Sequence, residues 1–184
     1  MEVIKTKLDG VVIITPNVFE DNRGYFFESF NQKEFNEKIC KIEFVQDNES
    51  MSSRGVMRGL HFQRPPYAQS KLVRCTKGEV IDIAVDLREG SPTYGEYVAV
   101  HLSALNYRQL FIPKGFAHGF VVLTDTAKFQ YKCDEFYHPE ADGGISIIDD
   151  RWNWDFPMEG VILSDKDKKL PLFKDFKTPF KYNG

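Results

Sequence analysis

Cysteine is scarce in this sequence, with only Cys40, Cys75 and Cys133 among 184 residues. Their wide spacing matches neither a zinc site nor a framework of disulfides. All three lie in apolar or strand-like surroundings, so we expect buried or semi-buried thiols in a cytoplasmic protein. Long apolar runs are also absent, and no segment has the length of a membrane-spanning helix or the character of a signal peptide.

An excess of basic residues is lacking as well. The formal net charge is −3, from 24 Lys and Arg against 27 Asp and Glu. A protein of this charge has no field that would attract nucleic acid or an anionic membrane, so we expect neither as a partner. A local cluster of cations in such a chain instead predicts a pocket for a small anion.

Aromatic residues, in contrast, are abundant at 14% of the chain, which favours strands over long helices. At least eight short runs alternate between polar and apolar residues or are rich in β-branched ones, with turn signals between them. We therefore predict an all-β antiparallel sandwich or barrel that forms a single domain over residues 1–184. Outside the central stretch described below, the predicted strands cover residues 11–16, 25–30, 42–50, 79–87, 97–103, 108–113, 116–123 and 127–137.

One short helix is predicted over residues 32–39. Asn31 is a good N-cap, and Glu34 stands three residues later, where a capping box places its acidic residue. From Arg151 onward the alternation stops, and we expect an irregular C-terminal segment that is anchored by its tryptophan, leucine and phenylalanine side chains.

The central stretch, residues 56–75, carries one histidine, one lysine and three arginines on two β-like runs joined by a proline turn. Cations between apolar residues are costly to bury unless an anion meets them, so we place the chemistry here. Strict alternation would put Arg58 and His61 on opposite faces of a strand. Both can enter one pocket only if Gly59 permits a bulge or the strand begins there.

Carboxylates interrupt two of the other predicted strands. In residues 25–30 the alternation places Glu28 between two phenylalanines on one face, which fits either the rim of an edge strand or a carboxylate in a pocket. In residues 79–87 it places Asp82 and Asp86 opposite the face that is formed by isoleucine, valine and leucine.

A turn near residue 115 carries a first resemblance. Pro113 to His118 reads Pro-Lys-Gly-Phe-Ala-His and matches the P-x-G-x-x-H signature of cupins, which are small double-sheet jelly rolls. Cupins that bind a metal usually carry an H-x-H pair in their first motif, whereas Gln63 follows His61 here. Even with His101 and His118, a three-histidine site is incomplete, so we predict no metal.

Seven more segments extend the resemblance. With the turn, they make the chain resemble the dTDP-4-dehydrorhamnose 3,5-epimerases, a family of cupin folds that work without a metal or another cofactor. The matching segments lie in the expected order and cover residues 23–28, 44–48, 58–63, 71–75, 78–80, 112–120, 131–132 and 163–167. The resemblance implies an antiparallel double-stranded jelly-roll (cupin) barrel with short helices, a dTDP-sugar as substrate and a homodimer.

The resemblance also implies roles for individual residues. His61 would be the base, held by Asp167, and Tyr131 would be the opposing acid, with Lys71 beside the keto oxygen of the sugar. The implied substrate contacts are Arg23, Glu28, Gln46, Asn48, Arg58, His118, Asp142 and Lys166. Asp142 departs from the family pattern, because members often carry glutamate there.

The implied reaction inverts carbons 3 and 5 of dTDP-4-dehydro-6-deoxy-D-glucose and gives dTDP-4-dehydro-L-rhamnose, a step of dTDP-L-rhamnose biosynthesis. A hydrogen beside a ketone is acidic because its carbanion delocalises into an enolate. Inversion then needs a base on one face, an acid on the other and a donor at the oxygen. Two alternatives stay open: a single-carbon epimerase or ketoisomerase on a related dTDP-4-keto sugar, and a sugar-binding cupin without activity.

Overall fold

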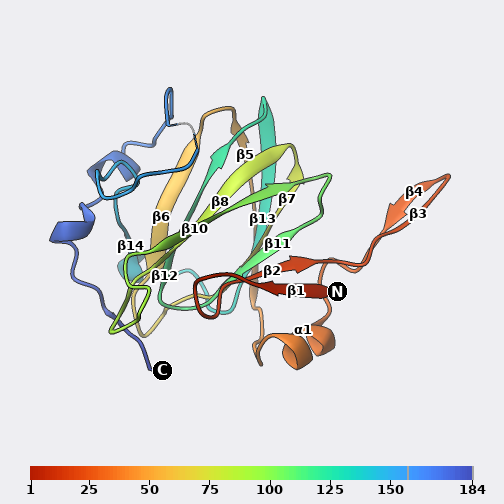
Figure 1. The fold of residues 1–184 in the computed structure, drawn as a ribbon, viewed down its shortest axis with the longest axis horizontal. Coiled ribbons are helices and arrows are strands. Elements are labelled where there is room, and N and C mark those ends of the chain that lie inside the picture. The colour runs from red at the N-terminus through yellow and green to blue at the C-terminus, as the bar shows by residue number, and fades with distance from the viewer. Residues whose placement is uncertain (157, 184) are drawn as a thin grey trace.

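The computed structural model describes residues 1–156 and 158–183 and consists mainly of β-strands (Figure 1). Its elements are β1 (Glu2–Lys5), β2 (Val12–Thr15), β3 (Phe19–Asp21), β4 (Gly24–Phe26), α1 (Gln32–Lys38), β5 (Gln46–Ser53), β6 (Met57–Gln63), β7 (Lys71–Lys77), β8 (Glu79–Asp86), β9 (Arg88–Glu89), β10 (Tyr97–Ser103), β11 (Gln109–Ile112), β12 (Phe116–Val122), β13 (Thr126–Cys133), the 3₁₀ helix η1 (Pro139–Ala141), β14 (Asp142–Gly144), η2 (Asp167–Lys169), η3 (Phe173–Asp175) and β15 (Phe180–Lys181).

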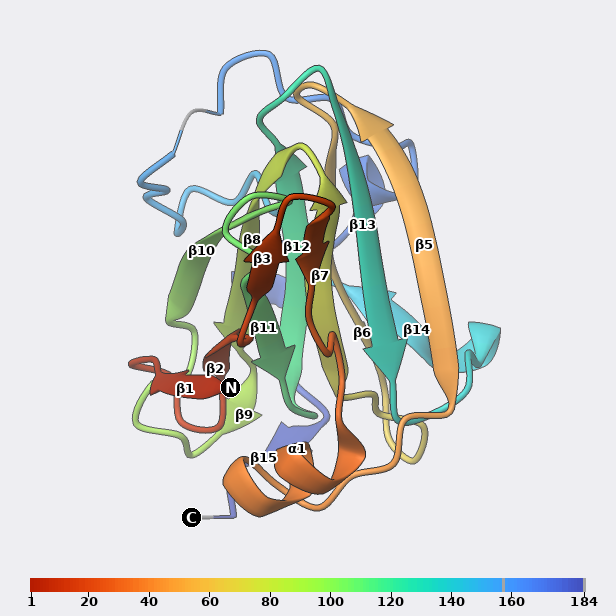
Figure 2. The ribbon, with the colours of Figure 1, turned by 90° about the vertical axis from the view of Figure 1, so that its right-hand side faces the viewer.

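Two antiparallel sheets form the body of the protein. The six-stranded sheet has the order β1-β2-β11-β7-β13-β5, and the five-stranded sheet has the order β10-β8-β12-β6-β14. Figure 2 shows the first sheet from β5 through β13 and β7 to β11, with α1 below its end. Strands that are neighbours in a sheet are often distant in sequence, and this arrangement confirms the predicted all-β jelly roll.

The main apolar core lies between the two sheets. It takes Val73 and Phe129 from the six-stranded sheet and Val80, Phe116 and Phe120 from the five-stranded sheet. Because side chains of a strand alternate, every second residue of β7, β8, β12 and β13 points into this space. Polar residues at the same phase of these strands therefore also face the interior.

A second apolar cluster covers the outer face of the five-stranded sheet. The C-terminal segment supplies Trp152, Phe173 and Phe180, which pack with Ile83 and Val85 of β8. The segment is irregular, as predicted, and it brings η2 against β6.

Among the described residues, no helix has the length and the apolar character needed to cross a membrane.

The predicted helix is confirmed with one residue fewer. The Asn31 side chain accepts a hydrogen bond of 3.1 Å from the backbone N–H of Glu34, as an N-cap does. Helix α1 ends at Lys38, and its Phe35 is buried in a third apolar cluster.

Three strand predictions had wrong bounds. The strand predicted over residues 127–137 ends at Cys133, where the ladder with β5 and β7 ends. The run from residue 42 alternates because Ile42 and Phe44 pack beside α1, whereas the ladder with β13 begins only at Gln46. The strand predicted over residues 25–30 ends at Phe26, where the short hairpin of β3 and β4 ends. The hairpin projects from the body of the protein (Figure 1). Strands β1, β3, β9, β14 and β15 were not predicted.

Candidate active site

A pocket of about 390 Å³ opens between the two sheets near the ends of β5, β7 and β13. Seven of the twelve predicted site residues line it: Gln46, Asn48, His61, Lys71, Tyr131, Asp142 and Lys166. They come from five strands and from the turn before η2. The fold therefore gathers residues that are separated by as many as 120 positions in the sequence.

His61 stands on β6 and is held from behind by Asp167. Its Nε2 lies 2.6 Å from Oδ1 of Asp167, whose side chain is only 4% exposed. Burial alone would raise the pKa of Asp167, but the hydrogen bond with His61 and its charge outweigh that effect and hold the pKa below its usual value. An ionised Asp167 accepts the Nε2 proton, so the other ring nitrogen, Nδ1, is left to act as a base.

A β-bulge turns Arg58 to the same side of β6 as His61. Residue His118 of β12 pairs with His61, and Phe120 pairs with Arg58, so two steps along β12 match three along β6. Gly59 has a φ of +126°, and a Cβ there would lie 2.6 Å from the Cα of Gly119. Only glycine fits such a close approach at positive φ. The bulge that the sequence left open is thus confirmed.

Tyr131 and Lys71 face His61 from the opposite sheet. They stand on the neighbouring strands β13 and β7, and the Lys71 Nζ lies 5.6 Å from the centroid of the Tyr131 ring. Burial raises the pKa of the Tyr131 hydroxyl, so it stays protonated at neutral pH. Burial also lowers the pKa of Lys71. Within residues 1–156 and 158–183, neither polar head makes a hydrogen bond to another side chain, so both can donate to a ligand.

Polar side chains line the mouth of the pocket. The Gln46 Nε2 donates to the Asn48 Oδ1 at 3.1 Å, which fixes two amides side by side on β5. Lys166 forms an ion pair with Asp142, and its hydrogen bond to that carboxylate raises the pKa of Lys166. The Tyr137 hydroxyl donates to the same carboxylate at 3.4 Å. Tyr137 was not predicted as a site residue, since a single aromatic beyond a strand gives no distinctive pattern.

Asp167 and four predicted substrate contacts do not line this pocket. Arg58 lies nearby, where its Nε donates to the Ser52 Oγ at 3.0 Å. His118 is buried deeper between the sheets and binds Asp82. Arg23 stands at the tip of the hairpin, with 85% of its side chain exposed.

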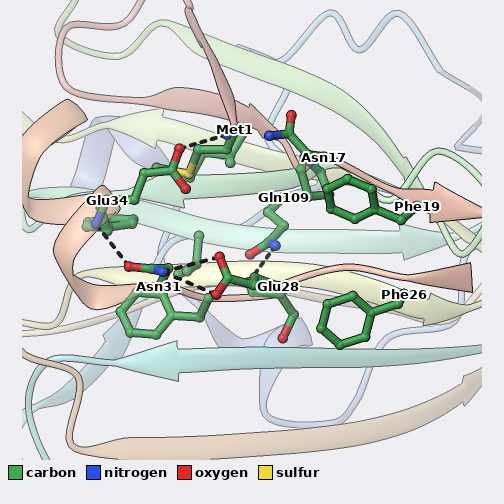
Figure 3. Close-up of a pocket in the computed structure, with 14 residues that line it drawn as sticks. Met1, Asn17, Phe19, Phe26, Glu28, Asn31, Glu34 and Gln109 are labelled. Atoms are coloured by element: carbon green, nitrogen blue, oxygen red, sulfur yellow. Dashed lines mark hydrogen bonds and ion pairs between the residues drawn. The ribbon is translucent and has the colours of Figure 1, made fainter.

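Glu28 lies in a different place from the catalytic candidates. It lines a second pocket of about 240 Å³ with Phe19 and Phe26, beside the start of α1 (Figure 3). Its carboxylate accepts hydrogen bonds from the Asn31 Nδ2 at 3.2 and 3.3 Å. Glu28 therefore lies beyond the end of β4 and not on a strand rim, and it lines this pocket with an exposed side chain.

Gln63, the residue at the place of a second cupin histidine, has a structural role. Its side chain is buried, and its Nε2 donates to the backbone carbonyls of Tyr67 at 2.7 Å and Phe136 at 3.0 Å. Its Oε1 accepts from the backbone N–H of His138 at 2.7 Å. Across the part of the chain that the structure describes, no three His, Cys, Asp or Glu side chains are grouped to hold a metal ion.

Known proteins match both the sequence and the fold. The family model of dTDP-4-dehydrorhamnose 3,5-epimerase matches residues 5–175. The chain belongs to this family. The resemblance seen in the sequence is thereby confirmed.

Individual members of the family are similar over nearly their whole length. The dTDP-4-dehydrorhamnose 3,5-epimerase of Escherichia coli K12 is 56% identical over 172 residues, which cover 92% of this chain and 93% of that protein. A Legionella pneumophila epimerase, solved in complex with dTDP-4-keto-L-rhamnose, superposes with a TM-score of 0.95 at 46% identity and covers 100% of this chain and 99% of its own.

A more distant structure shows that the fold alone does not decide how many carbons are inverted. A 3'-monoepimerase from Streptomyces bikiniensis superposes with a TM-score of 0.87 at 28% identity, over 92% of this chain and 86% of its own. The number of carbons must therefore depend on the site and not on the jelly roll.

Proposed function

We propose that this chain epimerises dTDP-4-dehydro-6-deoxy-D-glucose at carbons 3 and 5 to dTDP-4-dehydro-L-rhamnose. One observation carries the proposal. His61, which is held from behind by Asp167, and the hydroxyl-bearing Tyr131 stand on two facing sheets and line one pocket. A base and an acid on opposite walls are what inversion at carbon requires. The similarity to the Legionella enzyme, whose structure holds the product sugar nucleotide, supports the choice of substrate.

The reaction at each carbon uses these residues in sequence. His61 removes the proton beside the ketone, and the buried Asp167 carboxylate stabilises the imidazolium that forms. The electron pair moves onto the keto oxygen, where the Lys71 ammonium donates a hydrogen bond to the enolate. Tyr131 then delivers a proton to the opposite face of the same carbon. The base on one wall and the acid on the other invert the centre. Proton exchange with solvent then returns His61 to its neutral form and Tyr131 to its protonated form.

The remaining polar groups suit the nucleotide diphosphate. Arg58 and Lys166 supply positive charge near the mouth of the pocket, where phosphate oxygens would lie. Gln46 and Asn48 offer amide groups on the wall beside Tyr131. Asp142 is a shorter acceptor than the usual glutamate and is engaged by Lys166. His118 contacts the sugar from the deep end of the site in this proposal.

Arg23 and Glu28 act in this proposal through a homodimer. The hairpin that carries Arg23 projects from the body of the chain, and its Phe19, Tyr25 and Phe26 are all more than half exposed. Exposed aromatic side chains on a projecting hairpin favour burial against another copy. A partner's hairpin could then bring a cation to a site that lacks it within one chain.

The free thiols of the three cysteines suit a cytoplasmic enzyme.

The function is tested by product analysis. Purified protein is incubated with dTDP-4-dehydro-6-deoxy-D-glucose, and the ring couplings of the product are read by NMR, with His61→Ala as the matched inactive variant. We expect the doubly inverted L-sugar from the wild-type protein alone. A product that is inverted only at carbon 3 would favour the single-carbon epimerase, and recovery of bound but unchanged substrate would favour a sugar-binding cupin.

The dimer is tested by mixing two inactive variants, Arg23→Ala and His61→Ala. If the hairpin acts across the dimer, half of the sites in a mixed dimer combine an intact His61 with an intact Arg23. Random mixing of equal amounts should then restore about a quarter of the wild-type rate. If Arg23 acts within its own chain, no site is intact, and the mixture stays as inactive as its components.

A further inference from the structure

The segment that follows β13 connects the edges of the two sheets at the mouth of the catalytic pocket. Strand β5 is an edge of the six-stranded sheet and β14 an edge of the five-stranded sheet, and both lie on the same side of the molecule (Figure 2). Tyr137 contacts both edges. Its backbone N–H donates to the Oε1 of Gln46 on β5 at 3.1 Å, and its hydroxyl donates to the Oδ2 of Asp142 on β14 at 3.4 Å. Tyr137 therefore spans the mouth from one wall to the other.

Both contacts of Tyr137 reach polar pairs that line the pocket. The Gln46 amide accepts from the Tyr137 N–H and donates in turn to the Asn48 Oδ1 at 3.1 Å. Because an amide has one accepting and one donating end, the Tyr137 N–H fixes which end of Gln46 faces Asn48. On the other wall, the Asp142 carboxylate that accepts from the Tyr137 hydroxyl is paired with Lys166. The place of Tyr137 thus determines how two polar pairs are presented to a ligand.

The buried side chain of Gln63 on β6 holds the backbone around Tyr137. Tyr137 lies in an irregular segment and is 54% exposed, so its own burial fixes it only weakly. The Gln63 Nε2 donates to the backbone carbonyl of Phe136 at 3.0 Å, and the Gln63 Oε1 accepts from the backbone N–H of His138 at 2.7 Å. One amide therefore holds the residue before Tyr137 and the residue after it.

Both N–H donors of the Gln63 amide are engaged by backbone groups. The second one is bonded to the carbonyl of Tyr67 at 2.7 Å, and a side-chain amide carries only two such donors. The Tyr67 ring stacks on the His138 ring, with the centroids 3.6 Å apart and an angle of 10° between the planes. Gln69 holds the start of the same segment through the carbonyl of Glu135 at 2.8 Å. Although Gln63 lines the pocket, its bonds are therefore made to the segment and not toward a substrate.

We propose that Gln63 is a positioning residue for the reaction: its buried amide holds the backbone on both sides of Tyr137 and thereby fixes the two polar pairs at the mouth for the sugar nucleotide. The inference rests on the proposed function, because it concerns binding at that same site. Without the amide, buried backbone groups would lose their partners, and the segment would leave the sheet edges to regain hydrogen bonds with water.

The experiment replaces Gln63 by methionine, which has a similar length and makes none of the three hydrogen bonds. Affinity for dTDP is measured by calorimetry, and KM and kcat are measured with the sugar nucleotide. We expect the Kd for dTDP and the KM to rise at least fivefold. The kcat at saturating substrate should stay within about twofold of the wild type, because the His61–Asp167 pair and Tyr131 do not depend on this segment. An unchanged Kd for dTDP in Gln63→Met overturns the inference.

A double-mutant cycle with Tyr137→Ala shows whether Gln63 acts through Tyr137. The alanine variant removes the ring and the hydroxyl that reaches Asp142, but it keeps the backbone N–H toward Gln46. In this background we expect Gln63→Met to change the Kd for dTDP by at most half, on a logarithmic scale, of its effect in the wild-type protein. Equal effects in the two backgrounds would mean that Gln63 acts independently of Tyr137, and the inference would be wrong.

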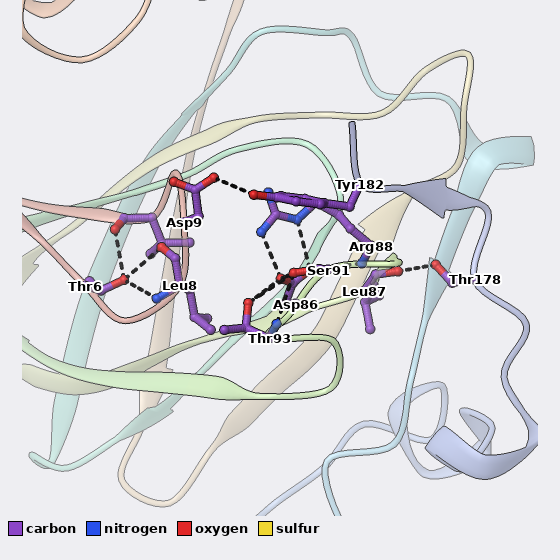
Figure 4. Close-up of polar contacts among 11 residues, drawn as sticks. Thr6, Leu8, Asp9, Asp86, Leu87, Arg88, Ser91, Thr93, Thr178 and Tyr182 are labelled. Carbon is purple, nitrogen blue, oxygen red and sulfur yellow. Dashed lines mark hydrogen bonds and ion pairs between the residues drawn. The ribbon is translucent and has the colours of Figure 1, made fainter. Parts of the chain in front are cut away.

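Ser91→Ala is the matched control, since Ser91 is another buried polar side chain that holds a turn, and this turn does not line the pocket. The Ser91 Oγ donates to the Asp86 Oδ2 at 2.6 Å and accepts from the backbone N–H of Thr93 at 3.2 Å (Figure 4). We expect Ser91→Ala to lose thermal stability, as Gln63→Met does, and to keep the wild-type Kd for dTDP. If both variants lose affinity alike, the loss follows stability and not the position of Tyr137, and the inference is overturned.

A second variant keeps the test decisive if Gln63→Met does not fold. Gln63→Glu retains an acceptor for the His138 N–H and loses both donors toward Tyr67 and Phe136, and it enters the same cycle with the same expected result. The proposed function is tested separately. A wild-type protein that binds dTDP without epimerising the sugar nucleotide would overturn that function, and the cycle of dTDP affinities could still be read.

Discussion

Replacing Tyr131 by phenylalanine should separate the two halves of the proposed reaction. The substitution removes one oxygen and keeps the ring, which packs with Phe129 at a centroid distance of 6.3 Å. The hydroxyl makes no hydrogen bond to the rest of the described chain, so no internal partner is left unsatisfied. We therefore expect the free energy of unfolding to change by no more than about 0.5 kcal/mol.

The effect on the reaction should be much larger. Tyr131 is the one hydroxyl that we place opposite His61, so its loss removes the proton donor for the inverting face. Loss of a general acid lowers the rate by roughly a hundredfold or more. That factor corresponds to about 2.7 kcal/mol in the activation free energy. Proton removal by His61 does not need the hydroxyl and should continue.

The assay follows two quantities in deuterated water. Mass spectrometry measures deuterium that enters the recovered substrate beside the ketone, and NMR measures inverted product. In Tyr131→Phe the exchange should outlast the formation of product. If this variant still forms the doubly inverted sugar at a near-native rate, another group is the acid, and Tyr131 serves only to pack the core.

Three other predictions concern the base, the diphosphate and the metal. His61→Ala should abolish nearly all turnover. Asp167→Asn should retain a measurable rate, because the imidazole remains while its tautomer is poorly fixed. If His61→Ala still exchanged hydrogens at the sugar carbons at the wild-type rate, His61 would not be the base. By calorimetry, Arg58→Ala should weaken dTDP binding more than Arg74→Ala, whose guanidinium is bound to Gln130, and equal losses would contradict the assignment of Arg58. Turnover should withstand a chelator, since the Gln63 amide is committed to backbone groups; loss of activity that one divalent ion restores would refute this.

Local signals in the sequence predicted the elements that local physics determines. The Asn31 cap and the alternation of β8 and β10 depend on neighbours in the chain, and the structure confirms them. Residues 42–45 show where such signals mislead. A period of two also arises when a loop packs alternate side chains against a helix, so the pattern alone cannot tell a ladder from a loop.

The prediction that the pocket residues lie together depended on the resemblance to the epimerase family. Nothing local connects His61 with Asp167, which are 106 positions apart and meet because η2 packs against β6. The sequence also could not show that Asp82 and Asp86 have different partners. Both have the same phase on one strand, but Asp82 binds His118, whereas Asp86 binds Arg88, Ser91 and Thr93 in the turn beyond it. Long-range packing decides such differences, and alternation does not report it.

The number of solvent hydrogens that enter the product tests the central claim most directly. Wild-type protein converts dTDP-4-dehydro-6-deoxy-D-glucose in deuterated water, and the product is analysed by mass and by NMR at each ring carbon. Two inversions through an enolate predict one deuterium at carbon 3 and one at carbon 5. Deuterium at a single carbon, or an inverted product without any deuterium, would contradict the proposed double epimerisation.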